Sequence, residues 1–179
     1  VKDAAEQEAM RASSKVNDDC MAEFEALIRP GITEKEMADA IKGIYAAHGC
    51  SDVSFEPICG FGPHAADPHH DNDDTPLTAG QGVLIDVGGV YHNYCSDMTR
   101  TFFTGEPTEE ERTVYELVRK AQAAAEALVK PGVRLCDIDA AARDLITEAG
   151  YGPYFNHRLG HFIGLEDHEA GDVSAVNQN

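Results

Sequence analysis

Hydrophobic residues recur at helical spacing in four segments of this chain. In the first segment Val16, Cys20 and Phe24 lie on one stripe, and acidic residues fill the opposite face. A spacing of three to four residues is typical of an amphipathic helix that packs one face on a core. The sequence therefore predicts helices over 3–29, 34–48, 108–129 and 135–149, a short strand near 53–58, and a loop over 60–79.

Local signals mark where these helices begin and end. Thr33 with Glu36, and Thr108 with Glu111, have the spacing of capping boxes, in which paired side chains satisfy N–H groups of the first helical turn. Gly49 follows the second helix, where a residue with positive φ commonly ends a helix. The helical segments are therefore bounded by their own residues as well as by the hydrophobic pattern.

After the loop, the hydrophobic period changes from helical spacing to alternation. β-Branched and aromatic residues dominate two runs, 83–91 and 94–103, which a short polar turn separates, so a β-hairpin is predicted. Alternation places Asp86 on one face of the first strand and Asp97 on one face of the second. If the turn is centred at 91–92, the aspartates lie directly opposite, with Cβ atoms about 4.5–5.5 Å apart.

Two ionised carboxylates that converge in a mostly apolar hairpin repel each other, so a compensating charge is expected. A shared proton, a bound cation or an ion pair with Arg100 would each supply it. From the hairpin alone, these alternatives stay open.

The helices carry an internal repeat. A shift of 101 residues aligns 25–32 with 126–133, both of which end a helix at Pro-Gly, and the alignment continues to Gly49 and Gly150. Two copies indicate a duplicated half-domain, so 20–58 and 121–159 are predicted to superpose as helix, helix and strand through a near-twofold rotation. A second copy of the hairpin would begin near position 184, so the chain is expected to be incomplete at its C-terminus.

Composition limits the classes of protein that need consideration. With 179 residues, of which 42% are hydrophobic, one domain over 1–179 is predicted. The formal net charge of −18 argues against nucleic acid or an anionic membrane as a partner. There is no apolar run of bilayer length and no signal-peptide pattern, so a cytoplasmic location is expected. The five cysteines are dispersed and odd in number, which favours free thiols over a disulfide framework.

A second cluster of chemically active residues lies near the end of the chain. His157, His161 and His168 fall within twelve residues and are separated by glycines. On a helix, His157 and His161 would share one face, but Gly160 and Gly164 interrupt the segment, so an extended or bent strand is predicted instead. Three histidines at this density indicate a site as readily as a structural role.

These segments together resemble the pita-bread metallopeptidases, the family of prolidase, aminopeptidase P and methionine aminopeptidase. The hairpin carries Asp-x-Gly followed by Ser-Asp-x-Thr-Arg-Thr-Phe at 96–102, and the later segment carries His-x-x-Gly-His-x-x-Gly-Leu-x-x-His-Glu at 157–169. Both motifs are similar to the proline-directed branch. The resemblance implies an α+β fold of two duplicated halves around a curved antiparallel sheet.

The resemblance also implies roles for individual residues. Asp86, Asp97 and His161 match ligands of two divalent metal ions, for which manganese is favoured and cobalt or zinc are alternatives. His157 and His168 match residues that contact the substrate and the tetrahedral intermediate. In the loop, Pro68-His69 resembles an element whose histidine points into the active site, although Asp67 replaces a common apolar residue and His70 follows directly. The family's two glutamate ligands would lie beyond Asn179.

The implied activity is hydrolysis of Xaa-Pro bonds by a metal-bound hydroxide, with a peptide as partner and homodimer formation left open. Two alternatives remain: a non-catalytic module that keeps the fold for binding, and a metal-independent, creatinase-type hydrolase, which the two aspartates disfavour. Because two glutamates and a hairpin are expected downstream, the chain alone is predicted to bind metal weakly and to hydrolyse poorly.

Overall fold

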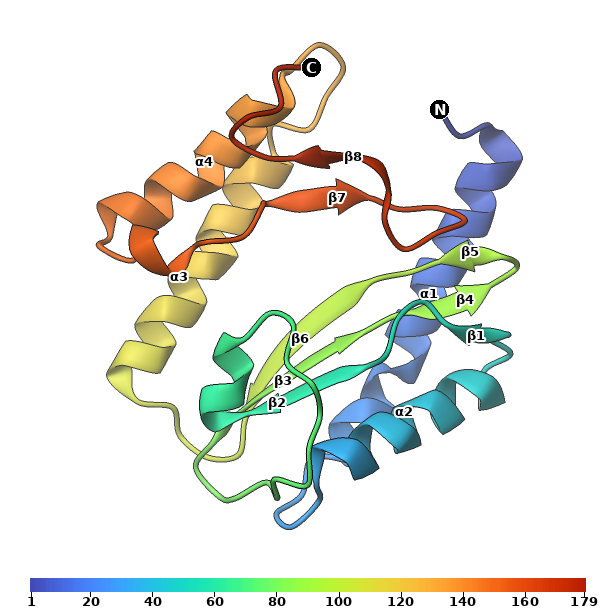
Figure 1. Cartoon of the computed structure of the whole chain (residues 1–179), viewed down its shortest axis with the longest axis vertical. Helices are drawn as coiled ribbons and strands as arrows, with labels where there is room; N and C mark the ends of the chain where they lie inside the picture. Colours follow the sequence, from blue (N-terminus) through green and yellow to red (C-terminus); the bar gives the residue numbers. More distant parts are fainter. The chain divides into compact units, whose positions relative to one another are not determined.

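The computed structural model describes residues 1–179 and divides the chain into two compact units. The first unit comprises 1–107 together with 163–167, and the second comprises 108–162 together with 168–179. Each unit contains a pair of helices and a set of antiparallel strands (Figure 1).

The first unit packs two helices against two small antiparallel sheets. Helix α1 spans Ala4–Ala26 and α2 spans Glu34–Ala47. The strands are β1 (Asp52–Val53), β2 (Ile58–Phe61), β3 (Gly82–Val87), β4 (Gly89–Tyr91), β5 (Tyr94–Cys95) and β6 (Met98–Phe103). One sheet has the order β2-β3-β6 and the other the order β1-β4-β5. A short 3₁₀ helix, Gly62–Ala66, follows β2, within the segment predicted to be a loop.

The core of this unit forms where the helical stripe meets the inward face of the sheet. Phe24 and Tyr45, one from each helix, are almost fully buried, and their rings make an edge-to-face contact at 5.2 Å. Val83, Ile85 and Val87 alternate along β3, and none of them is exposed. The predicted stripe and the predicted alternation therefore meet in one core.

The second unit is built on α3 (Glu109–Glu126) and α4 (Leu135–Glu148). A 3₁₀ turn, Gly152–Tyr154, leads to the two-stranded sheet of β7 (Gly160–Phe162) and β8 (Glu169–Val173). Both predicted capping boxes are present, at α2 and at α3. The first helix ends three residues earlier than predicted, with Leu27 as its C-cap.

In both units, a glycine with positive φ follows each helix of the pair. Gly31 and Gly132 follow the first helix of each pair with φ of 92° and 88°, and Gly49 and Gly150 follow the second with φ of 86° and 90°. A side chain would be strained at these angles, so the aligned glycines serve the same turns. In the second unit a 3₁₀ turn follows the helix pair and the strand begins at Gly160, just after the predicted range, so the superposition of the two halves by a near-twofold rotation stays a prediction.

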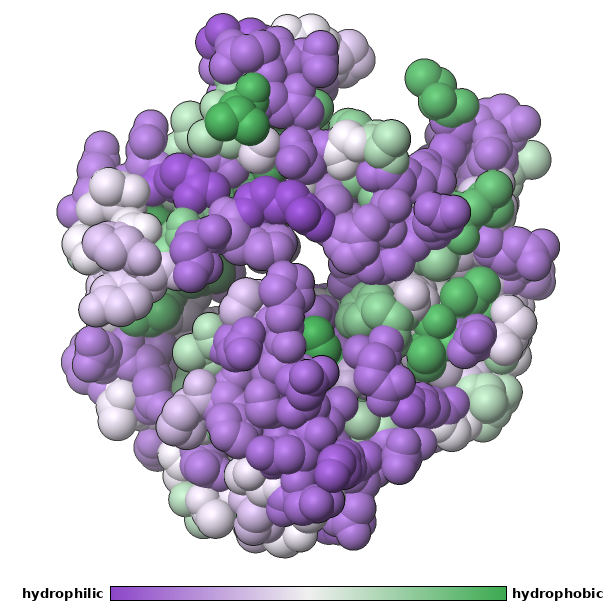
Figure 2. Space-filling view, in the orientation of Figure 1, coloured by the Kyte–Doolittle hydropathy of each residue, from purple (hydrophilic) through white to green (hydrophobic).

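The surface agrees with the acidic composition. In the face shown in Figure 2, hydrophilic residues predominate and hydrophobic ones are scattered among them. None of the helices is both long enough and apolar enough to cross a membrane.

Candidate metal centre

Asp86 projects from the middle of the first unit's larger sheet. In β3 the buried residues alternate with half-buried ones, and Asp86 belongs to the half-buried row. Strand β6 pairs Asp86 with Thr99, whose hydroxyl donates a hydrogen bond of 2.6 Å to Asp86 Oδ1. A hydrogen bond of this kind orients a carboxylate that ligates a metal.

The register of the hairpin differs from the predicted one. Tyr91 pairs with Tyr94, and the turn consists of His92 and Asn93, both with positive φ. Asp86 therefore lies opposite Thr99 rather than opposite Asp97. Asp97 immediately precedes β6, so it lies just outside the paired register, and its place beside Asp86 stays a prediction.

The backbone beside Asp97 is held by a buried hydrogen-bond network. Ser96, which is 2% exposed, donates from its hydroxyl to Asn17 Oδ1 at 3.0 Å, and Tyr45 donates to the same oxygen at 2.8 Å. The Gly89 N–H donates back to Ser96 Oγ at 3.1 Å. Asn17 of α1 and Tyr45 of α2 thus help to fix Ser96, the residue before Asp97. These residues lie far apart in the chain, so the sequence did not reveal this support.

Gly88 is the glycine of the Asp-x-Gly motif, and its surroundings show why glycine is needed there. A Cβ at this position would lie 1.9 Å from the Ser96 carbonyl oxygen, far inside van der Waals contact. Only glycine permits this approach of the two hairpin strands. Glycine is therefore required at position 88 because the backbone there lies against that of Ser96, the residue before Asp97.

Arg100, which one alternative paired with one of the two aspartates, is turned away from the row of Asp86. The register pairs Arg100 with Ile85, so its side chain projects from the opposite face of the sheet. Its guanidinium donates to the Thr99 carbonyl at 2.9 Å. The hairpin register therefore directs the Arg100 side chain away from the Asp86 row.

In the second unit, His161 and His168 come together. His161 lies in β7, as the prediction of an extended segment required, and its ring packs on that of His168 with centroids 4.1 Å apart. His161 Nδ1 lies 3.2 Å from the Phe162 carbonyl oxygen. Because a carbonyl oxygen only accepts, Nδ1 is the donor in this bond.

The segment before β7 is anchored by an ion pair that sequence analysis missed. The fully buried Asp139 pairs with Arg143 at 2.7 Å, one turn apart on α4. Arg143 also donates to the carbonyls of Phe155 and His157 at 2.8 and 2.9 Å. The spacing of four is a recognisable helical ion pair, but the burial that gives it importance depends on tertiary packing.

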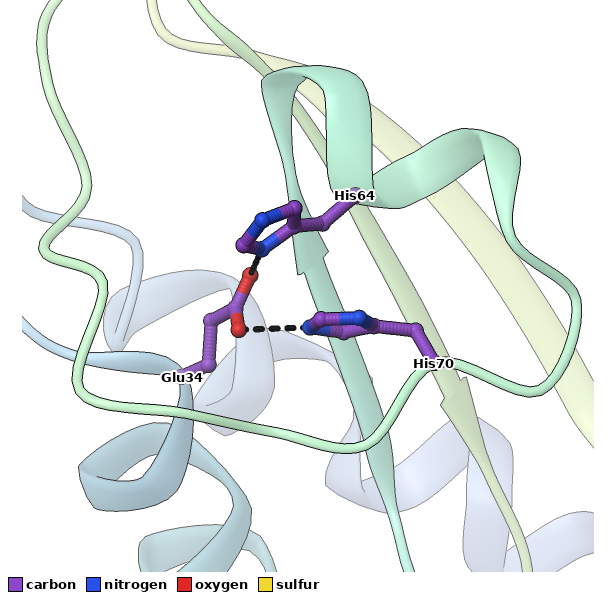
Figure 3. A group of neighbouring side chains, drawn as sticks. All are labelled: Glu34, His64 and His70. Carbon is purple, nitrogen blue, oxygen red and sulfur yellow. Dashed lines mark hydrogen bonds and ion pairs between the residues drawn. The ribbon is translucent and has the colours of Figure 1, made fainter.

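His69 lies in the exposed loop after the 3₁₀ turn, and its N–H donates to Asp67 Oδ1 at 2.9 Å. The histidines on either side of it, His64 and His70, both contact the buried carboxylate of Glu34 (Figure 3). The local sequence indicates for Glu34 only that it begins a helix. The structure thus shows that the loop is attached to α2 through two histidines.

Comparison with known proteins identifies the family of the chain. Residues 8–179 match the profile of metallopeptidase family M24. The chain is 37% identical to the X-Pro aminopeptidase of Thermotoga maritima, with a TM-score of 0.97 and coverage of 100% of this chain and 51% of that one. It is 42% identical to the dipeptidase PepE of Mycobacterium ulcerans, with a TM-score of 0.96 and coverage of 100% and 48%. An uncharacterized peptidase of Staphylococcus epidermidis is 44% identical over 170 residues, which are 95% of this chain and 48% of the relative.

The chain belongs to metallopeptidase family M24. The predicted family and the predicted α+β pita-bread fold are therefore confirmed, and the chain spans about half the length of the relatives it matches. Two of the candidate donors are held by hydrogen bonds in a way that suits the divalent metal ions of this family: Asp86 accepts from Thr99, and His161 Nδ1 donates to a backbone carbonyl. The union of Asp86, Asp97 and His161 at one centre stays a prediction.

Proposed function

We propose that this chain forms part of a metal-dependent peptidase that cleaves the bond before proline. The observation that carries the proposal is the hairpin register, which pairs Asp86 with Thr99 and turns Arg100 away from that row of the sheet. Similarity to an X-Pro aminopeptidase and to a dipeptidase supports a substrate of this class.

Asp86, Asp97 and His161 would hold two divalent ions, which supply a hydroxide at neutral pH and polarise the scissile carbonyl. Carboxylate-rich donor sets favour manganese. Thr99 keeps the Asp86 carboxylate in one orientation through its 2.6 Å hydrogen bond. The buried network at Ser96 keeps the backbone of Asp97 in place. The metal ligands on this hairpin are thus supported before substrate arrives.

The histidines would act on the substrate. His157 Nδ1 donates to the Arg158 carbonyl at 2.9 Å, and this bond would hold the ring in one orientation for contact with a peptide. His168, whose ring lies beside that of His161, would donate a hydrogen bond to the oxyanion that develops during hydrolysis. His69, on the exposed loop, would contact the substrate from that loop. These roles follow the family resemblance and remain part of the proposal.

The test uses the full polypeptide that the gene encodes, supplied with Mn²⁺. We expect hydrolysis of Ala-Pro but not of Pro-Ala or Ala-Ala, measured by chromatography of the released amino acids. Asp97→Asn should lower kcat/KM at least about 100-fold because it removes a metal ligand. Asp137→Asn, an exposed carboxylate on α4, is the matched control and should leave the rate unchanged. Metal binding without hydrolysis of any peptide would favour the non-catalytic binding module instead.

A further inference from the structure

A second group of metal-type donors lies in the first unit, away from the hairpin aspartates in the sequence and unused by the proposed mechanism. Glu34 is the first residue of α2, His64 lies in the 3₁₀ turn Gly62–Ala66, and His70 lies in the loop that follows. One ligand atom from each of the three lies within 4.8 Å of the others. Figure 3 shows both imidazole rings directed at the two oxygens of the one carboxylate.

The distances are close to those of a metal site. His64 Nδ1 lies 2.9 Å from Glu34 Oε1, and His70 Nε2 lies 2.6 Å from Glu34 Oε2. In a tetrahedral site with bonds of about 2.0–2.2 Å, neighbouring ligand atoms are about 3.4 Å apart. The carboxylate and the rings therefore need to separate slightly, which side-chain rotation can supply.

Charge makes this position favourable for a cation. The Glu34 side chain is 0% exposed, so the negative charge is held away from water. Two backbone N–H groups, of Phe61 and Asp73, and the two rings are its hydrogen-bond donors. The carboxylate thus already favours positive charge on the ring side.

We propose that Glu34, His64 and His70 bind a divalent ion of the zinc class at a site distinct from the one that the hairpin aspartates would form. Two imidazoles and one carboxylate are a recognised ligand set for zinc, with water in the fourth position. The ion replaces the two N–H protons that point at the carboxylate, and these protons move to the other ring nitrogens or to solvent. The bound ion ties the loop on both sides of His69 to the start of α2.

This site does not depend on the proposed peptidase function, so its test needs no activity. The full polypeptide carrying Asp86→Asn and Asp97→Asn, which disable the hairpin ligands, is titrated with Co²⁺ and then competed with Zn²⁺. Visible absorption of four-coordinate Co²⁺ reports the ligand set. Hydrogen exchange of 62–74, with and without Zn²⁺, reports the loop.

We expect one Co²⁺ per chain in this background, displaced by Zn²⁺, with slower exchange in the loop. Adding His64→Asn should weaken Zn²⁺ binding at least about tenfold. His64 is 34% exposed and asparagine still donates to Glu34, so this variant should fold, as circular dichroism can confirm. His48→Gln removes a histidine from another histidine–glutamate pair, with Glu23 at 2.6 Å, and should change nothing. Absence of Co²⁺ binding, or binding that His64→Asn and His70→Gln leave unchanged, would overturn the proposal.

Discussion

Replacing Asp139 by asparagine should destabilise the segment that leads to the histidine motif. The substitution keeps the size of the side chain and removes its charge. In the wild type, Asp139 accepts two hydrogen bonds from Arg143, at 2.7 and 2.9 Å, and one from the Leu159 N–H at 3.2 Å. An amide cannot accept from both guanidinium nitrogens, so Arg143 loses its counter-charge while its carbonyl contacts remain.

The expected loss of unfolding free energy is about 3 kcal/mol. Removing one partner of a buried ion pair costs about 3–5 kcal/mol because the other charge is left uncompensated. The lower end applies because the side chain of Arg143 keeps 27% exposure and can be hydrated, whereas that of Asp139 has none.

The same helix supplies the matched control. Arg134 and Asp137 pair at 2.7 Å, but their side chains are 57% and 46% exposed. Asp137→Asn should therefore cost only about 0.2–1 kcal/mol, the range of solvent-exposed pairs. Urea unfolding followed by far-ultraviolet circular dichroism measures both variants, and hydrogen exchange at 155–161 localises the effect.

A loss below 1 kcal/mol for Asp139→Asn, or equal losses for the two variants, would refute the assignment of Asp139 as the anchor of this segment. Equal hydrogen exchange at 155–161 in wild type and variant would refute the link to the histidine motif even if stability fell.

Two further predictions concern backbone geometry and pH. Gly88→Ala should lower the free energy of unfolding by about 3 kcal/mol or more because the new Cβ would lie 1.9 Å from Ser96 O. Gly43→Ala, in open space on α2, should raise the free energy of unfolding by about 1 kcal/mol. Urea unfolding that ranks the two variants otherwise would contradict the close approach of the backbone at Gly88 to Ser96. Hydrogen bonding from the Thr108 N–H lowers the pKa of Glu111 below its ordinary 4.5, so the stabilisation is present above pH 4.5 and is lost as pH falls through the folded-state pKa. Acid titration of stability should then cost the wild type more than Glu111→Gln, and parallel curves would contradict this.

The parts of the fold that local chemistry determines could be predicted from the sequence. Thr33 with Glu36 form the predicted capping box, with hydrogen bonds of 2.9 and 3.2 Å, because the residues that make it are three apart. Gly31 and Gly132 take the same positive φ because both end a helix at the same Pro-Gly turn.

The hairpin register could be predicted only with the exact position of the turn. The predicted turn at 91–92 is one residue early, since His92 and Asn93 together occupy the positive-φ positions of a two-residue turn. Asparagine at 93 was an available signal for that conformation. A one-residue displacement of the turn centre shifts the pairing by two, so Asp86 kept its predicted face but gained Thr99 as its partner.

The supports of the site could not be predicted because they join residues far apart in the chain. Ser96 contacts Asn17 across 79 positions, and Glu34 contacts His70 across 36. Each of these residues is ordinary in its local sequence, and its importance comes from burial beside a distant partner.

The most direct test of the account is a count of bound metal. The full polypeptide, as wild type, Asp97→Asn and Asp137→Asn, is dialysed against Mn²⁺ and the metal per chain is measured by mass spectrometry of the digested protein. The account predicts two Mn²⁺ per chain in the wild type and in Asp137→Asn, and fewer than one tightly bound Mn²⁺ in Asp97→Asn, because this variant loses a carboxylate ligand. An unchanged count in Asp97→Asn would contradict the claim that the hairpin aspartates hold the metal.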